Sequence, residues 1–496
     1  MSHNNKKTLY TVIGVVAVAA IIFGLYSYAG QESFIRTVLS GLTLGSLFFL
    51  VAAGLTLIFG LMDVLNFAHG SMFMLGAYIG WQFYTNPTFI FGVLPLLLAF
   101  AAGILLVPLF KPKLVRLELS DVWQKRLPKL MYLAALIVGG IALWKFDVIG
   151  LADTAMVAAV TTSANPLAEL SAQEPLLRFM WRPLLLMVSG ALVAVGVSRP
   201  GDRTEITAPE PLKKRLILLI VLVILTIVFT LVRENASEAV LLMNGNLRFL
   251  LAIITATGFG FLLGALIEIT MIRPLYVRSF FIVLMTLGLS YVLRELVQVL
   301  WDPLAYQMVR PPLFAQPGRA NTIAEWLMNG SSTISIVGVT FPTYRLFVIA
   351  LGFVMFIFVT VLMTRSRLGM VIRAGVQDPQ MVEALGINVK SVFTLVFALG
   401  VALAALGGIG AAPFLPVQPG MGDQYQMQGF ITVVIGGMGS YVGAFVGAII
   451  LGMARAFGDY FALKWQLSPT IAEASTVIIM IVVLLLRPQG LFGKKD

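Results

Sequence analysis

Long apolar segments separated by short polar ones make up most of the chain. A helix of about 20 apolar residues crosses a bilayer core about 30 Å thick. Because backbone polar groups cannot face lipid unpaired, we expect each long apolar segment to be helical. This pattern predicts an all-α, polytopic membrane protein. The thirteen candidate segments are 9–28, 34–61, 67–84, 88–110, 130–149, 179–198, 216–232, 247–272, 279–301, 344–363, 392–412, 428–453 and 469–486.

Basic residues orient these segments, since cytoplasmic loops of membrane proteins accumulate Lys and Arg. With the N-terminus inside and a crossing at every segment, four basic loops fall on the cytoplasmic side. Together with the two ends of the chain they hold 22 of the 34 Lys and Arg residues. The long loop 302–343 carries only Arg310 and Arg319, so we expect it outside. The four inside loops are 111–129, 199–215, 273–278 and 364–391.

Thirteen full crossings conflict with this orientation, because they would place the basic C-terminal tail outside. The segment 428–453 is interrupted by Gly436–Ser440, which contains three glycines. A half-span that turns back there restores the parity and leaves about 12 transmembrane helices. Broken or re-entrant helices are tolerated where they line a cavity inside the protein. The segment Asn66–Ser71 is a second candidate break.

The two interruptions resemble each other, since each reads Gly-Ser, a few apolar residues and then Gly-Ala. They lie in Ala68–Ala77 and in Gly437–Ala444. Two such breaks in opposite halves of a chain indicate an internal repeat around a central pathway, although small and apolar residues also recur by chance. Five residues of these motifs are candidate pathway residues, namely Gly70, Ser71, Gly437, Gly439 and Ser440.

Asp63, Asn66 and His69 place polar groups inside an otherwise apolar region. Polar groups at membrane depth are costly and tend to face a cavity or one another. One interpretation is that Asn66 and His69 line or gate a pathway. The alternative is a satisfied helix break, in which Asn66 caps the following helix.

Composition narrows the chemistry further. Apolar residues make up 59% of the chain and charged residues 11%, which excludes a soluble enzyme, a coiled coil and a disordered protein. There is no Cys, and His3 and His69 are the only histidines, so we expect no metal site and no catalytic residues. The net charge of +11 is explained by membrane topology rather than by nucleic-acid binding.

The N-terminal segment 1–33 has two interpretations. Lys6 and Lys7, followed by an apolar stretch and small residues, are typical of a cleaved signal peptide. The apolar stretch is long for a signal peptide, so we favour a retained transmembrane helix.

The loop 364–391 predicts a short amphipathic helix on the cytoplasmic side. Asp378 can cap its N-terminus, Pro379 can occupy its first position, and Gly386 can end it. An exposed apolar ridge on this helix would dock another protein, or it would rest on lipid. The residues of the expected ridge are Met381, Val382, Ala384 and Leu385.

Several motifs in the same order resemble LivH-type permeases, the membrane subunits of branched-chain amino acid ABC importers. The resemblance covers residues 34–85 and 247–493. The motifs are Gly41–Ser46, Leu65–Gly70, Arg273-Pro274 with Arg278, Leu368-Gly369, Ala384–Asn388, Gly436–Ser440 and Arg487–Leu491.

This resemblance implies that the loop helix is the coupling helix that contacts an ATPase subunit. Carried over residue by residue, the coupling role falls on Arg373, Asp378, Glu383, Ala384 and Gly386. The chain has no phosphate-binding Gly-x-x-x-x-Gly-Lys-Ser/Thr motif, so ATP would be used by a partner and the chain itself needs no cofactor and is no enzyme.

The implied partners are two ATP-binding subunits, a second permease subunit (homologous or identical) and a periplasmic or extracellular substrate-binding protein. The implied location is the bacterial plasma (inner) membrane. The resemblance also implies alternating access driven by the ATPase subunits, with branched-chain or other small neutral amino acids as substrates.

Residues 86–246 depart from this family pattern and look like an insertion with about four extra apolar spans. The expected organisation is therefore an N-terminal segment 1–33, a first core part 34–85, the insertion, and a second core part 247–496 that contains the coupling loop.

Other functions remain open at this point. A urea or short-chain amide permease has similar membrane subunits. An ion-coupled secondary transporter would need ionisable residues near mid-membrane, for which Glu268, Arg294 and Glu295 are candidates, although they lie toward segment ends and can snorkel. A membrane enzyme acting on lipid would need a clustered catalytic set.

Overall fold

The computed structural model describes residues 23–62, 65–115, 120–160, 174–197, 212–276 and 278–493. Helices dominate, and the chain divides into two compact units. The larger unit comprises 1–81, 249–297 and 303–496, and the smaller comprises 82–248 and 298–302. The insertion expected at 86–246 starts and ends close to the boundaries of the smaller unit.

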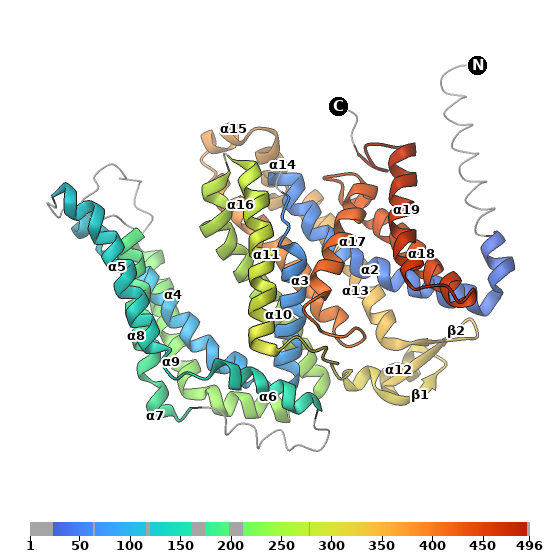
Figure 1. The fold of residues 1–496 in the computed structure, drawn as a ribbon, viewed down its shortest axis with the longest axis horizontal. Helices are drawn as coiled ribbons and strands as arrows, with labels where there is room; N and C mark the ends of the chain where they lie inside the picture. The colour runs from blue at the N-terminus through green and yellow to red at the C-terminus, as the bar shows by residue number, and fades with distance from the viewer. Residues whose placement is uncertain are drawn as a thin grey trace. The chain divides into compact units, whose positions relative to one another are not determined.

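The larger unit contains the longest helix, α2, and the C-terminal helices (Figure 1). Helices α3, α10 and α11 each extend from it into the smaller unit. Its elements are α2 (Gln31–Met62), α3 (His69–Thr85), α10 (Gly245–Ile267), the π-helix η2 (Glu268–Ile272), the 3₁₀ helices η3 (Arg273–Leu275) and η4 (Pro312–Phe314), α11 (Ser279–Trp301), β1 (Gln316–Ala320), α12 (Ile323–Asn329), β2 (Ser331–Ile336), β3 (Val339–Pro342), α13 (Thr343–Arg365), α14 (Arg367–Gln377), α15 (Pro379–Ala384), α16 (Val389–Ala411), α17 (Met421–Gly436), α18 (Tyr441–Lys464) and α19 (Thr470–Leu486).

Helices α2 and α16 form the centre of this unit. In their most apolar stretches, 83% of the residues of α2 and 72% of those of α16 are buried, against 22% in α13. Small residues permit this packing, since the backbones of α2 and α16 meet where Gly54 faces Gly400. Helices α13, α17 and α18 pack on α2 from other sides. The central helices are therefore enclosed by protein rather than by lipid.

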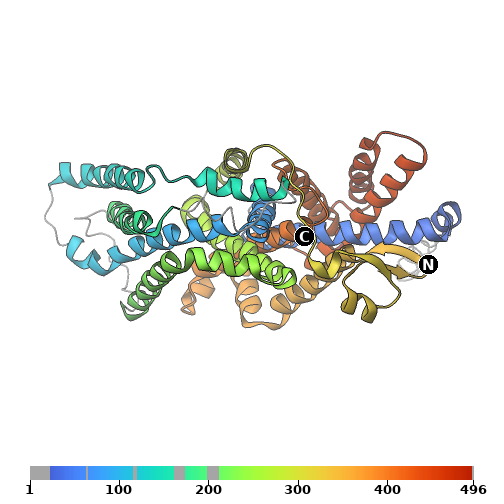
Figure 2. The same cartoon turned by 90° about the horizontal axis from the view of Figure 1, so that it is seen from below.

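The loop expected outside the membrane, 302–343, contains a small three-stranded sheet. Strand β1 pairs parallel with β2, and β2 pairs antiparallel with β3, with Ile334 opposite Phe341. The short helix α12 between β1 and β2 is capped by Thr322, whose hydroxyl accepts a hydrogen bond from the Glu325 amide. The sheet lies beside α2 in Figure 2. In Figure 1 it lies at the end of the unit opposite α14 and α15, as a loop on the other side of a membrane would.

The smaller unit is a group of helices in which α8 packs between α4 and α5, while α6 and α9 pack on α4. Its buried apolar residues include Leu96, Ala99 and Leu186. The elements are α4 (Thr88–Val115), α5 (Asp121–Ala142), α6 (Val148–Val160), α7 (Leu176–Phe179), α8 (Trp181–Val197) and α9 (Leu212–Leu242).

The prediction of a single helix over residues 130–149 is wrong. Helix α5 ends at Ala142, and the chain turns through Lys145, which has a φ of +56°, before α6 begins. The buried Arg182 holds the end of α5, because its guanidinium donates hydrogen bonds to the carbonyl oxygens of Ala142 (2.6 Å) and Trp144 (3.0 Å). Its charge is balanced by Glu174 at 2.6 Å.

Within the described residues, nine helices are long and apolar enough to cross a membrane. The prediction of an all-α polytopic membrane protein is therefore confirmed, with the small sheet as an addition. Helices α3 and α19 are apolar but have only 17 residues each. Residues 9–22 of the predicted segment 9–28 lie outside the described residues, as do Lys6, Lys7, Lys494 and Lys495.

Candidate translocation and coupling sites

The break between α2 and α3 is held from both sides by Gln426 of α17. The Gln426 amide nitrogen donates to the Asn66 carbonyl oxygen at 3.2 Å, and its Oε1 accepts from the Gly70 amide. The Asn66 side chain accepts from the Ala68 amide at 3.0 Å, which makes a turn just before α3. Asn66 thus shapes the turn before α3, but its side chain does not cap the helix itself, and its Nδ2 has no hydrogen-bond partner among the described residues. Asp63 lies outside the described residues.

His69 and Ser71 are also packed into protein. The His69 ring is fully buried, and its Nε2 lies 3.1 Å from the Val51 carbonyl oxygen of α2. The Ser71 hydroxyl lies 3.0 Å from that of Ser290 in α11. The backbone at Gly70 touches Gly422, so there is no room for a side chain. In this conformation the four candidate residues from Asn66 to Ser71 join α3 to its neighbours, and a role in a pathway stays a prediction.

The second break is a tight turn between α17 and α18. Helix α17 ends at Gly436, and the Ser440 hydroxyl caps α18 by accepting a hydrogen bond from the Gly443 amide at 3.1 Å. Gly437 has a φ of +97°, which strongly favours glycine, and its backbone lies against Gly493. The chain therefore turns back at the point where the sequence predicted a half-span.

The C-terminal Arg487–Leu491 motif covers the same turn. The amides of Leu491 and Phe492 donate to the carbonyl oxygens of Ile435 and Gly436 at 2.9 and 3.0 Å. These bonds satisfy carbonyl groups at the end of α17 that the helix itself leaves unpaired. A cavity of about 460 Å³ borders this turn and is lined in part by Gly439, Ser440 and Thr364. The candidate pathway residues Gly439 and Ser440 therefore lie beside an open volume.

The coupling loop contains two short helices, α14 and α15. The helix predicted after Asp378 is present, because the Asp378 carboxylate accepts a hydrogen bond from the Met381 amide at 2.9 Å. At its other end Gly386 has a φ of +82°, and the Ile387 amide bonds back to the Val382 carbonyl oxygen at 3.3 Å. Local sequence signals alone account for both ends of α15.

The exposed face of α15 differs from the expected ridge at one position. Met381 and Leu385 are 64% and 73% exposed, whereas Val382 is only 4% exposed and packs inward. Including Val382 in the ridge was wrong, since its side chain is buried against the protein. The expected coupling residues Arg373, Glu383 and Ala384 are all exposed. A partner could therefore contact them, and their coupling role stays a prediction.

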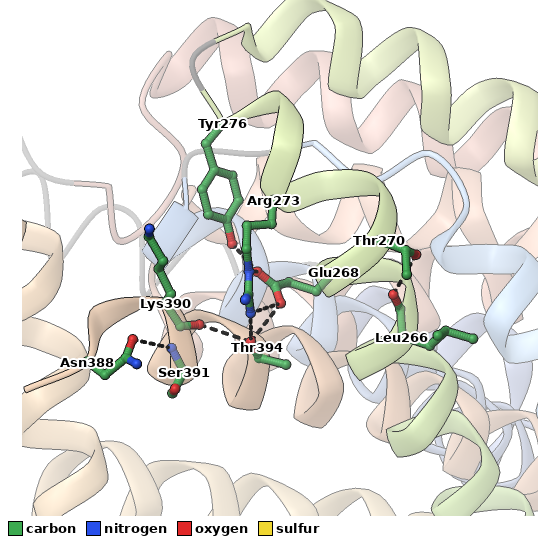
Figure 3. Close-up of polar contacts among 9 residues, drawn as sticks. All are labelled: Leu266, Glu268, Thr270, Arg273, Tyr276, Asn388, Lys390, Ser391 and Thr394. Carbon is green, nitrogen blue, oxygen red and sulfur yellow. Dashed lines mark hydrogen bonds and ion pairs between the residues drawn. The ribbon is translucent and has the colours of Figure 1, made fainter. Parts of the chain in front are cut away.

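A cluster that the sequence did not reveal lies next to this loop (Figure 3). Glu268 is fully buried, and the Arg273 guanidinium holds its two carboxylate oxygens at 3.2 and 2.9 Å. The Tyr276 hydroxyl donates to the same carboxylate. Burial and this hydrogen bond raise the pKa of Tyr276 above its ordinary value, so the hydroxyl keeps its proton at neutral pH. The π-helix at Glu268–Ile272 brings these side chains together.

Thr394 of α16 joins this cluster from a distant part of the sequence. Its hydroxyl lies 2.6 Å from Glu268 Oε2 and 2.6 Å from an Arg273 nitrogen. Residues 273–278 look like a simple basic anchor in the sequence, and Glu268 looks like a snorkelling side chain. The sequence signal for the cluster was Glu268, five residues before Arg273. Thr394 lies far away in the sequence, so no local pattern points to it.

Residues 37–121 and 131–486 match the family described as branched-chain amino acid transport system / permease component. The chain belongs to this family. The match runs through most of the segment that the sequence suggested as an insertion. Within the described residues, no group of three or more His, Cys, Asp or Glu side chains could hold a metal ion.

Individual members of the family are similar over parts of the chain. The high-affinity branched-chain amino acid transport system permease protein BraD of Pseudomonas aeruginosa is 30% identical over 251 residues, which are 50% of this chain and 74% of BraD. The corresponding LivH protein of Escherichia coli K12 is 31% identical over 173 residues, 35% of this chain and 54% of LivH. A probable LivH of Methanocaldococcus jannaschii is 29% identical over 142 residues, covering 27% of this chain and 42% of that protein. No solved structure matches the chain.

Proposed function

We propose that this chain is the transmembrane permease subunit of an ABC importer for branched-chain or other small neutral amino acids. The observation that carries this proposal is the family match over residues 37–121 and 131–486 of a chain with nine membrane-crossing helices in its described part. The named relatives are branched-chain amino acid permeases, which favours this reading over a urea or short-chain amide permease.

Energy for transport comes from partner subunits in this proposal. The exposed face of α15, with Met381 and Leu385 beside Glu383, is the surface on which an ATP-binding subunit would push. Helix α15 is followed after a few residues by α16. The Glu268 cluster links the start of α16 to η2, which directly follows α10. Movement of the loop would therefore reach the centre of the larger unit along a continuous set of contacts.

The family assignment also supports three further partners, which we include in the proposal. They are a second permease subunit, a second ATP-binding subunit and a substrate-binding protein on the outer side of a bacterial inner membrane. We propose the breaks at Asn66–Ser71 and at Gly437–Ser440 as elements of the translocation pathway, since both interrupt helices inside the larger unit.

The assembly and substrate are tested together in bacterial cells that lack their own branched-chain amino acid transporters. The chain is expressed with the ATP-binding and binding-protein genes encoded beside it, and uptake of labelled leucine is measured with unlabelled valine or urea as competitor. We expect leucine uptake that valine inhibits and urea does not, and co-purification of an ATP-binding subunit. Uptake of urea instead of leucine would contradict the proposed substrate class.

A further inference from the structure

A pocket with polar and apolar walls lies in the larger unit. It has a volume of about 230 Å³ and lies between α2, the segment 415–418, α17 and α18. Pockets for drug-sized ligands measure roughly 300–1,000 Å³, so this one suits a smaller molecule. The segment 415–418 is fixed in place, because Val417 exchanges two backbone hydrogen bonds with Tyr306 at 2.8 and 2.9 Å. The pocket wall is therefore well defined.

Both signs of charge line this pocket one helical turn apart. Arg455 Nε lies 3.5 Å from Asp459 Oδ1, and Arg455 Nη1 lies 3.5 Å from Glu473 Oε1. Tight charge-assisted N–H···O bonds are shorter, about 2.7–2.9 Å. The Arg455 side chain is only 16% exposed, so its guanidinium is held near the pocket but loosely paired. A planar guanidinium with five donors can bind a carboxylate through two parallel hydrogen bonds.

A buried amide provides an independent sign of a ligand. Gln428 is 8% exposed, and its Oε1 has no hydrogen-bond partner among the described residues. A buried acceptor without a donor is unfavourable, and a ligand that supplies an N–H group relieves it. Gln424 lines the same pocket one turn earlier on α17. Gln428 thus brings a buried acceptor without a donor to the wall of this pocket.

Apart from Gln418, the rest of the wall is largely apolar. The Tyr425 ring stacks on Phe73 with ring centroids 4.4 Å apart and lies 6.0 Å from the Phe48 ring. Together with Phe48, the side chains of Leu44 and Leu415 line the pocket. An apolar group bound here would lie against aliphatic and aromatic surface, while a charged group would face the other wall.

We propose that this pocket binds the zwitterion of an α-amino acid with an apolar side chain. Arg455 receives the α-carboxylate, while Asp459 and the Gln428 carbonyl oxygen receive the α-ammonium group. The side chain lies against Phe48, Leu44 and Leu415. This inference rests on the proposed function, since it names the binding site for the same substrate class.

The charges of the pocket explain the selectivity that this proposal requires. Arg455 and Asp459 provide one positive and one negative group, so the pocket favours a molecule that carries two separated opposite charges. Urea has no such charges, and an amino acid amide or a simple carboxylic acid has only one of them. The pocket also lies toward the end of α18 at Lys464, which contacts Tyr28 just before the residues expected outside. A substrate delivered from outside would meet it early.

The test uses the assembled transporter with its ATP-binding subunits and binding protein in proteoliposomes. Labelled leucine uptake is measured for the native complex and for three variants, Arg455→Lys, Asp459→Asn and Gln428→Leu. We expect the KM for leucine to rise about tenfold in Arg455→Lys, because a lysine cannot reproduce the two-bond fork of a guanidinium. The matched control is Arg36→Lys, which makes the same change in the exposed Arg36–Glu32 pair.

Competition by analogues separates substrate binding from a merely structural role. In Arg455→Lys the preference for leucine over leucinamide should fall, and in Asp459→Asn the preference over 4-methylpentanoate should fall. The binding protein is the same in every sample, so a difference in analogue preference between two samples does not come from its own selectivity. Gln428→Leu removes a buried unpaired acceptor, so a purely structural role predicts a stable chain with an unchanged KM, whereas ligand binding predicts a raised KM.

Each outcome bears on one proposal. If the native complex takes up no leucine, the proposed function fails. If the native complex takes up leucine while all three variants keep its KM and analogue preferences, the function stands and the pocket assignment is overturned. Should Arg455→Lys or Asp459→Asn fail to assemble, the KM of Gln428→Leu decides the assignment.

Discussion

The Thr394 hydroxyl at the start of α16 lies 2.6 Å from the buried Glu268 carboxylate at the start of η2. The same hydroxyl also lies 2.9 Å from the Lys390 carbonyl oxygen of its own helix. A threonine has a single hydroxyl proton, and a carboxylate is the stronger acceptor, so we assign the proton to Glu268. The α16 helix that follows the coupling loop is therefore fixed to a part of the chain 126 residues earlier.

Replacing this hydroxyl should weaken the link without changing the shape of the side chain. We expect Thr394→Val to lower the free energy of unfolding by roughly 1.5–3 kcal/mol, the range for hydrogen bonds to charged groups. The measurement is thermal unfolding of the purified chain in detergent. The control is Thr270→Val, since the exposed Thr270 hydroxyl bonds only to the Leu266 carbonyl oxygen of its own helix. Equal shifts in the two variants would contradict the role of Thr394.

Charge reversal on the exposed face of α15 should separate ATP hydrolysis from transport. In Glu383→Lys we expect the assembled complex to keep its ATPase activity while leucine uptake per ATP falls severalfold, because the contact with an ATP-binding subunit loses charge complementarity. The measurement is ATPase activity and uptake on the same proteoliposomes. Glu238→Lys, an equal change on the exposed surface of α9, should leave the ratio unchanged. An unaltered ratio in Glu383→Lys would speak against α15 as the coupling surface.

The end of α15 depends on the backbone of Gly386. With a φ of +82°, an alanine there is strained by about 1–2 kcal/mol, although no neighbouring atom obstructs its Cβ. We expect Gly386→Ala to reduce leucine uptake per ATP with little effect on expression. Gly375→Ala is the control in the same loop, because its Cβ also meets open space but its φ is helical. Uptake that falls equally in both variants would show that the backbone at Gly386 is not the cause.

The contact between Gly70 and Gly422 should tolerate no side chain. A Cβ at Gly70 would overlap the Gly422 carbonyl oxygen, which belongs to backbone and cannot rotate away. Overpacking of this kind typically costs about 1–3 kcal/mol. We expect Gly70→Ala to lower the unfolding midpoint and to reduce uptake, whereas Gly420→Ala, with open space around its Cβ, should do neither. A fully stable Gly70→Ala chain would indicate that α3 and α17 are farther apart.

Features with local causes were predictable from the sequence. The helix expected at 279–301 is α11, and its ends coincide with Ser279 and Trp301 because a long apolar run, with Arg294 and Glu295 as its only charged residues, defines the segment. The α15 helix was predicted from its Asp378 cap, Pro379 and Gly386. The turn at Gly437 was predicted from a cluster of glycines, because glycine readily adopts the positive φ that this turn requires.

Features made by distant segments were not predictable. Strand β1 contains Pro317 and Gly318, both poor strand formers, and it exists because β2 pairs with it. The pocket at Arg455 needs α2, α17, α18 and the segment 415–418 to meet, and no spacing in the sequence shows this. The buried side of Val382 was missed because a six-residue helix carries too little periodicity to define a face.

In the proposed function, ATP hydrolysis by partner subunits drives leucine through this chain. The most direct measurement is labelled leucine uptake into proteoliposomes that contain the purified permease, its ATP-binding subunits and its binding protein, with ATP inside or outside. We predict uptake that requires ATP on the side of the ATP-binding subunits, stops with a non-hydrolysable ATP analogue and is unaffected when ion gradients are collapsed by ionophores. Uptake that needs an ion gradient and proceeds without ATP would contradict ATP-driven import through this chain.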